Sequence, residues 1–169
     1  MDLSIQKFTT LFILYIIVSI VFAILFQIGC TDRLKRAADS NTIELAKEEL
    51  TAAISYLEEM NFTKGYTKGY TSVLYKTPDE DIGFWYKNLN SSLNELKNVN
   101  PEASQLEKSN ILLKLRETIL DNSPNGISVT SPAGISKYPF NTFFALWGWL
   151  SCIVSAFLWI RFVIVKLQF

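Results

Sequence analysis

The chain has 169 residues, of which 49% are hydrophobic and 19% charged, and its 16 basic residues balance 16 acidic ones. It contains no histidine and two cysteines, Cys30 and Cys152. The composition excludes a Ser-His-Asp or Cys-His nucleophile system and leaves no His/Cys set for zinc or haem, so we expect no metal site and no cofactor. Two cysteines also provide no disulfide framework.

The first predicted element is an apolar run near the amino terminus. Residues 8–29 are 22 positions without a charge, which is about 33 Å of α-helix and matches the hydrocarbon core of a bilayer. We predict a transmembrane helix here, preceded by a short tail at 1–7. A cleaved signal peptide or a lipoprotein anchor at Cys30 is the alternative, but the apolar core is too long for a signal peptide and Gln27 replaces the usual aliphatic residue.

Residues 31–40 determine how the chain leaves this helix. They contain good helix formers and no helix breaker, which favours continuation of the first transmembrane helix. A break near Cys30 is the alternative, and the sequence leaves the choice open.

A polar helical domain is predicted at 30–122. Between the apolar runs, 13 basic residues accompany 15 acidic ones without a basic stripe, so we expect no nucleic-acid partner. Three helix starts are recognisable from capping sequences: N-T-I-E from Asn41, T-P-D-E from Thr77, and a third start at Pro101 or Ser104.

Apolar residues then recur every three or four positions, as in a bundle or coiled-coil seam. The three stripes are Ile43, Ala46, Leu50, Ala53, Leu57 and Met60; Ile82, Trp85, Leu89, Leu93 and Leu96; and Leu106, Leu112, Leu113, Leu115, Ile119 and Leu120. We predict an all-α membrane protein in which two transmembrane helices flank an antiparallel helical bundle of about three helices, with one stripe of each facing inward.

Aromatic residues suggest a partner surface on this domain. The stretch 61–77 contains T-K-G-Y twice, and its two closely spaced glycines predict a loop. The acidic and aromatic stretch 78–89 resembles a carboxylate pair for sugar hydrolysis, but acids in the first turn of a helix are explained by the helix dipole. The candidate surface consists of Tyr66, Tyr70, Tyr75 and Tyr86.

A turn-rich connector is predicted at 123–141. S-P-N-G and S-P-A-G each place proline second and glycine fourth, as in a type I turn, and the stretch 127–130 between them is predicted to be extended. A partner strand that pairs with this stretch is the functional alternative to a simple connector.

The second apolar run, 142–160, has 19 uncharged residues and predicts a second transmembrane helix, followed by a tail at 161–169. Small residues recur every fourth position on it, and the first run contains a similar pair. Such faces permit close helix contact in lipid, so we expect an antiparallel pair in which Ala23 meets Gly148 and Ser19 meets Cys152; a homo-oligomer formed through this face is the alternative. The candidate packing residues are Ser19, Ala23, Gly148, Cys152 and Ala156.

The positive charges near the spans give a divided indication of orientation. Arg33, Lys35 and Arg36 favour a cytoplasmic bundle, whereas Arg161 and Lys166 favour cytoplasmic termini. On balance we expect a multi-pass protein of the cell membrane with both termini in the cytoplasm and the bundle outside. This layout is similar to that of the input halves of bacterial chemoreceptors and sensor kinases, in architecture only.

The expected function is protein–protein contact, made through the bundle and the small-residue face of the transmembrane helices. We expect a small two-span protein that is an accessory, regulatory or sensor-like subunit of a membrane or envelope protein, and not an enzyme. An oligomeric membrane-permeabilising or pore-forming effector is the alternative. No charged residue lies inside either run, so a charged ion path or proton relay has no candidate residues.

Overall fold

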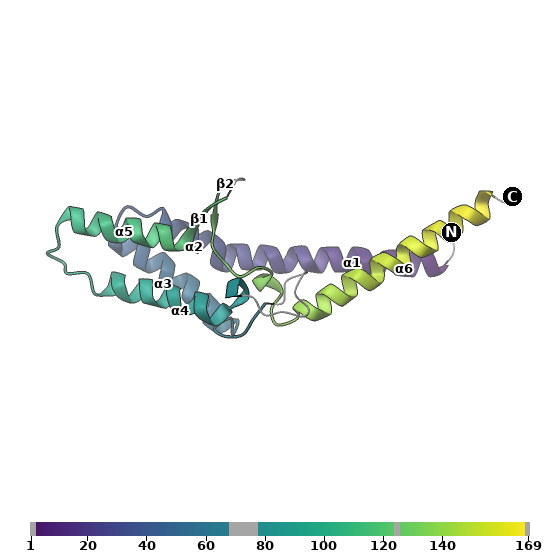
Figure 1. Cartoon of the computed structure of the whole chain (residues 1–169), viewed down its shortest axis with the longest axis horizontal. Helices are drawn as coiled ribbons and strands as arrows, with labels where there is room; N and C mark the ends of the chain where they lie inside the picture. Colours follow the sequence, from purple (N-terminus) through teal and green to yellow (C-terminus); the bar gives the residue numbers. More distant parts are fainter. Residues whose placement is uncertain (1–2, 68–77, 124–125, 168–169) are drawn as a thin grey trace.

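A computed structural model describes residues 3–67, 78–123 and 126–167. The molecule is elongated, with two long apolar helices at one end and a cluster of shorter helices at the other (Figure 1). In chain order its elements are α1 (Leu3–Phe26), the π-helical turn η1 (Gln27–Thr31), α2 (Asp32–Ala38), α3 (Ile43–Glu59), η2 (Pro78–Glu80), α4 (Ile82–Lys97), α5 (Gln105–Ile119), β1 (Leu120–Ser123), β2 (Gly126–Val129), η3 (Ile135–Lys137) and α6 (Asn141–Leu167).

One continuous helix joins the two ends of the molecule. At both ends of η1 the backbone stays helical, with φ −66° and ψ −40° at Phe26 and φ −60° and ψ −47° at Thr31. The continuation favoured from the sequence of 31–40 is therefore confirmed as far as Ala38. The π turn shifts the helical register where the apolar part of the helix meets the polar part.

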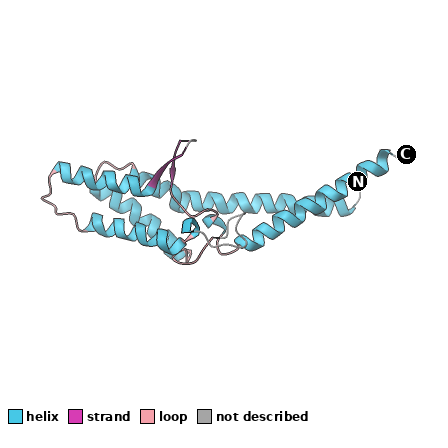
Figure 2. Ribbon diagram, viewed as in Figure 1, coloured by secondary structure: helices cyan, strands magenta, loops and turns pink. Residues whose placement is uncertain are grey.

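Two helices are long and apolar enough to span a membrane. They are the 33-residue helix Gln6–Ala38 and the 24-residue stretch Asn141–Ile164. Both extend beyond the predicted runs 8–29 and 142–160. α1 and α6 lie side by side, and both chain termini lie at the far end of the pair (Figure 2).

The helical domain contains four packed helices, one more than the three predicted from the sequence. α2 packs on α3 and α5, α3 packs on α4, and α4 packs on α5. α2 is the additional member, contributed by the extension of α1. The larger side chains that are most fully enclosed come from all four helices, from η1 and from the loop after α3: Cys30, Leu34, Leu50, Leu57, Thr67, Ile82 and Ile119.

The predicted stripes of the first two helices are buried with one exception. In α3 the stripe from Ile43 to Leu57 is buried and Met60, past the helix end, is exposed; in α4 all five stripe residues are buried. The stripe predicted for α5 is wrong in part, because Leu106 is 73% exposed and Leu113 is also exposed. Both lie about 180–200° around the helix from the buried Leu115, so one face cannot contain all three.

Side-chain caps fix where three helices begin. Thr42, and not Asn41, accepts a hydrogen bond from Leu45 N at the start of α3. Asp81 caps α4 after the short turn η2, so the helix begins four residues later than the sequence predicted from Thr77, which lies outside the described residues. Ser104 caps α5 by accepting from Glu107 N, which selects the second predicted start.

A β-hairpin corrects the all-α prediction. β1 and β2 pair antiparallel, with Leu120 opposite Val129 and Asp121 opposite Ser128. The expected extended stretch is thus a strand as far as Val129, while the centre of the first predicted turn lies outside the described residues. The second turn differs in register: Ile135 N donates to Pro132 O, and Gly134 is its third residue with φ +75°, a conformation that glycine adopts without a Cβ penalty.

Candidate functional site

The contact between α1 and α6 is built from aromatic side chains around one glycine. The Tyr15 and Trp147 ring centroids are 5.7 Å apart, and those of Phe22 and Phe144 are 5.4 Å apart. A Cβ placed on Gly148 would lie 2.9 Å from Tyr15 Cζ and Oη. Gly148 therefore makes room for Tyr15, and this contact replaces the one predicted between Gly148 and Ala23.

The predicted small-residue face is rotated relative to the observed contact face. Ser19 and Gly148 are partly buried, and Ser19 Oγ is enclosed, whereas Ala23, Cys152 and Ala156 are exposed. Ser151, which precedes Cys152 in the chain, is buried instead. It is 4% exposed and donates its hydroxyl hydrogen to Trp147 O (2.6 Å).

Helix geometry explains this rotation. A step of four residues advances 400° around an α-helix, so a series of such steps drifts by about 40° each time. Alternating steps of four and three stay on one face, as at Phe144, Gly148, Ser151 and Ser155, which are all buried or partly buried. The spacing 148, 152, 156 leaves that face and turns outward.

Two enclosed hydroxyls lie further along the pair. Thr9 Oγ1 and Ser155 Oγ are buried and have no hydrogen-bond partner in the described part of the chain. Starting from the contact between Tyr15 and Gly148, Thr9 is six residues along α1 and Ser155 seven along α6, or roughly 9 and 10.5 Å in the same direction. The register therefore places the two side chains at similar distances along the helix pair from the contact between Tyr15 and Gly148.

A second aromatic cluster joins the helix pair to the helical domain. Phe26 at the end of α1 packs against Tyr56 of α3 and Phe62, each with a centroid distance of 6.3 Å, and Phe62 packs against Tyr138 at 5.9 Å. The Tyr138 hydroxyl donates to Lys64 O (3.1 Å). Sequence reasoning missed this cluster, although aromatic residues at the ends of apolar runs are a usual signal of an interface.

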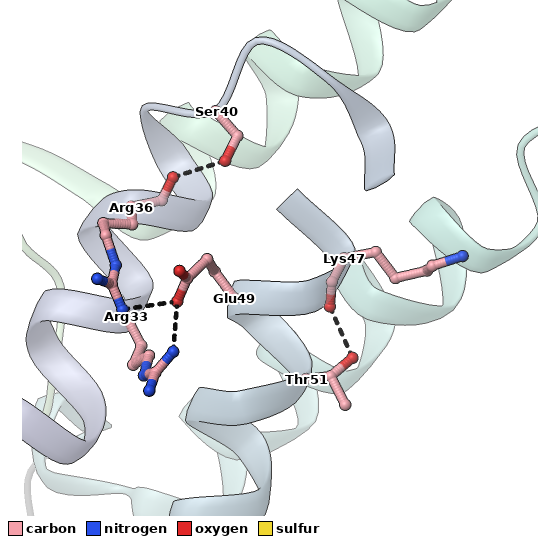
Figure 3. A network of polar contacts seen from close by, with 6 residues as sticks. All are labelled: Arg33, Arg36, Ser40, Lys47, Glu49 and Thr51. Atoms are coloured by element: carbon pink, nitrogen blue, oxygen red, sulfur yellow. Dashed lines mark hydrogen bonds and ion pairs between the residues drawn. The ribbon is translucent and has the colours of Figure 1, made fainter. Parts of the chain in front are cut away.

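Ion pairs fix α2 within the domain. Arg33 and Arg36 both reach Glu49 Oε2 on α3, at 3.1 and 3.0 Å (Figure 3). Directly after α2, Asp39 pairs with Arg116 of α5 at 2.6 Å. The Glu49 side chain is only 19% exposed, so its two contacts are less screened than those of a fully exposed pair.

The predicted tyrosine surface is only partly described. Tyr66 is exposed and its backbone forms a β-bridge with Asp81. The Tyr86 hydroxyl donates to Glu58 Oε1 (2.6 Å), and this hydrogen bond to a carboxylate raises the pKa of Tyr86. Tyr70 and Tyr75 lie outside the described residues.

A groove separates the start of α4 from the β-hairpin. Its volume is about 700 Å³. Trp85 closes its floor, where the indole Nε1–H donates to Thr130 O (2.7 Å). The acidic residues predicted for the first turn of the helix, Asp79, Glu80 and Asp81, precede α4: Asp79 and Asp81 line the groove, whereas Glu80 is buried and does not. The full lining is Pro78, Asp79, Asp81, Phe84, Trp85, Asn88, Leu89, Thr118, Asp121, Ser128, Val129, Thr130, Ser131 and Pro132.

The groove offers carboxylates, hydroxyl groups and aromatic rings to a ligand. Among the described residues, no three His, Cys, Asp or Glu side chains are grouped so that they could hold a metal ion. In comparisons with known proteins, no family model, no curated protein and no solved structure matches the chain.

Proposed function

We propose that the protein is a two-span integral membrane protein that acts through protein–protein contacts, as an accessory, regulatory or sensor-like subunit without enzymatic activity. The single observation that carries the proposal is the unbroken helix from α1 through η1 to α2. One rigid element belongs both to the apolar helix pair and to the helical domain, so a contact on the domain is mechanically linked to the pair.

Membrane insertion is supported by the exposure of the two apolar helices. Only 6% and 11% of their most apolar windows are buried within the molecule. A core helix of a water-soluble protein buries its apolar residues, and an exposed apolar area of this size requires lipid or another protein. Large outward-facing residues occur along both helices, for example Ile17, Ile24, Leu146 and Ile153.

Protein contact is supported by apolar residues on the surface of the helical domain. Leu45 on α3 and Leu106 on α5 are both exposed, although neither lies on the apolar helix pair. With the described domain already packed around its own core, these side chains remain available to a partner.

The orientation proposed for the domain is extracytoplasmic, with both termini in the cytoplasm. A single cysteine at Ser91, in a Cys30→Ala, Cys152→Ser background, tests it. Labelling of intact cells by a membrane-impermeant thiol reagent supports the proposed side, and labelling only after lysis reverses it.

Site-specific photocrosslinking in the native cells tests the function. A photoreactive residue replaces Leu45 or Leu106, and Ile17, which faces outward from α1, is the control position. We expect one partner protein, identified by mass spectrometry, to be captured from both domain positions and not from Ile17, with an unchanged membrane potential on overexpression. Capture of self-multimers alone, together with a collapsed potential, would contradict the proposal and favour the pore-forming alternative.

A further inference from the structure

We infer that the groove between α4 and the β-hairpin binds a basic segment of a partner protein, with an arginine side chain as its anchor. The inference rests on the proposed function, because it names the chemistry of the partner. It is carried by three properties of the groove: its two facing walls, the negative charge of all its charged lining residues and its exposed aromatic side.

The shape of the groove is set by both of its walls. The first turns of α4 form one side, and β1, β2 and the connector after them form the other. The bond from Trp85 Nε1 to Thr130 O ties the walls together at the floor. Asp121 and Ser128 are directly opposite in the hairpin register, so their side chains lie on the same face of the sheet.

The charge of the groove is negative throughout. Asp79, Asp81 and Asp121 line it, and no lysine or arginine does so within the described part of the chain. Asp81 Oδ1 is engaged as the cap of α4. Asp79 and Asp121 are exposed, so their carboxylates are accessible to a cationic group and attract it.

The aromatic side selects a cation with an apolar stem. Phe84 is 63% exposed and lines the groove together with the buried Trp85, which follows it in the chain. A guanidinium group stacks on an aromatic face, and the methylene stem of arginine packs on apolar surface while its charged end reaches carboxylates. The groove offers both contacts, because Phe84 and the two exposed aspartates line the same surface.

A segment of the same chain is a poor fit for this site. The basic residues Arg161 and Lys166 lie near the end of α6, and that end points away from the helical domain (Figure 1). The occupant that we infer is a separate protein that presents an arginine next to an apolar residue.

Fluorescence anisotropy tests the inference on the full chain in nanodiscs of phosphatidylcholine, a lipid without net charge. The probe is a dye-labelled peptide, Gly-Ser-Arg-Leu-Arg-Ser-Gly, and the reference is the same peptide with citrulline in place of arginine, which keeps the shape and removes the charge. We expect the arginine peptide to bind at least about tenfold more tightly than the citrulline peptide.

Matched variants separate the groove from general charge. Asp79→Asn combined with Asp121→Asn should weaken binding by at least about tenfold, whereas Glu102→Gln combined with Glu117→Gln, an equal charge change at exposed sites outside the groove, should alter it less than about twofold. Phe84→Ala should also weaken binding. Circular dichroism confirms that each variant keeps its helices.

Three outcomes would overturn the inference. They are equal binding of the two peptides, equal loss in the two double variants, and a change in self-association on Phe84→Ala without any peptide binding. If the photoreactive residue at Leu106 captures a partner while the arginine peptide fails to bind, the groove assignment fails and the proposed function stands. If both fail, the proposed function fails as well.

Discussion

Gly29 lies so close to the ring of Tyr56 that a Cβ at position 29 would overlap the ring. The contact joins the π turn of the long helix to α3. A glycine at this position allows the helix backbone to approach the Tyr56 ring at the end of the domain that adjoins the apolar helices.

Gly29→Ala should destabilise the fold by about 1 to 3 kcal/mol, because the added methyl group forces the ring or the helix to move. Thermal unfolding in detergent measures the loss. Gly83→Ala is the comparison: a Cβ there would lie 3.3 Å from Asp81 Oδ1, which caps α4, and farther from other atoms, so we expect a smaller loss than at Gly29. The double change Gly29→Ala, Tyr56→Ala should show non-additivity, and purely additive losses would contradict the contact.

Gly148→Leu should separate α1 from α6, because Tyr15 occupies the space that the new side chain would need. Disulfide formation between cysteines placed at Thr9 and Ser155, in a background without Cys30 and Cys152, reports the pair. We expect a strong decrease in crosslinking. Ala156→Leu and Ala23→Ile replace exposed residues and should leave crosslinking unchanged; a loss with either would restore the face predicted from four-residue spacing.

Glu49→Gln should lower the free energy of unfolding by about 1 kcal/mol, since two guanidinium groups lose their common carboxylate. Glu48→Gln is the control, because Glu48 is a neighbouring exposed carboxylate and should matter by less than about 0.5 kcal/mol. Chemical denaturation in detergent, at low and high salt, provides the measurement. The difference between the two variants should shrink at high salt, and a salt-independent difference would show that packing, not charge, links α2 to α3.

Trp85→Phe should loosen the hairpin while leaving the helices in place. The phenyl ring fills most of the floor but cannot donate to Thr130 O, so the carbonyl loses a partner at a cost of about 1 kcal/mol. Hydrogen exchange of the Thr130 amide, which donates to Ile119 O, should become faster in the variant. Unchanged exchange there, with normal helical protection elsewhere, would mean that the hairpin is held by other contacts.

The hydrogen bond between Tyr86 and Glu58 predicts a loss of stability at high pH. Because the pKa of Tyr86 is raised in the folded state, its contribution is present below the unfolded pKa of about 10 and is lost as the pH rises through the folded value. Tyr86→Phe should cost about 0.5 kcal/mol at neutral pH, since the pair is exposed. Unfolding at pH 8 and pH 11 checks this: the difference between wild type and variant should vanish or reverse at pH 11.

Local patterns predicted the helices well where the signal repeats over many residues. The stripe in α4 and the apolar runs of α1 and α6 are long, and each residue adds to the same periodic signal. The buried face of α5 was harder to predict, because Leu112, Leu113 and Leu115 lie within one helical turn. Composition alone does not say which of them faces inward. Only Leu115 is fully buried, because α5 packs against α2 and α4 on that side.

Strand pairing and contact faces could not be obtained in the same way. The extended stretch after α5 was predictable from the turn residues around it. Its partner β1 overlaps the end of the predicted helix, and a strand of four residues has too short a pattern to be distinguished from the end of that helix. In the helix pair, spacing by four suggested Ala23, Cys152 and Ala156, whereas the observed face alternates steps of four and three.

The sequence by itself determined two long apolar helices, a polar helical region between them and the stripes of α3 and α4, because hydrophobic periodicity and length act within each segment. Only the tertiary structure decided that α2 is a fourth packed helix, that Tyr15 meets Gly148, that Tyr56 covers Gly29, and that a hairpin and α4 enclose an acidic groove. These contacts join residues far apart in the chain, and they depend on how the surfaces of complete elements fit together, which no local pattern specifies.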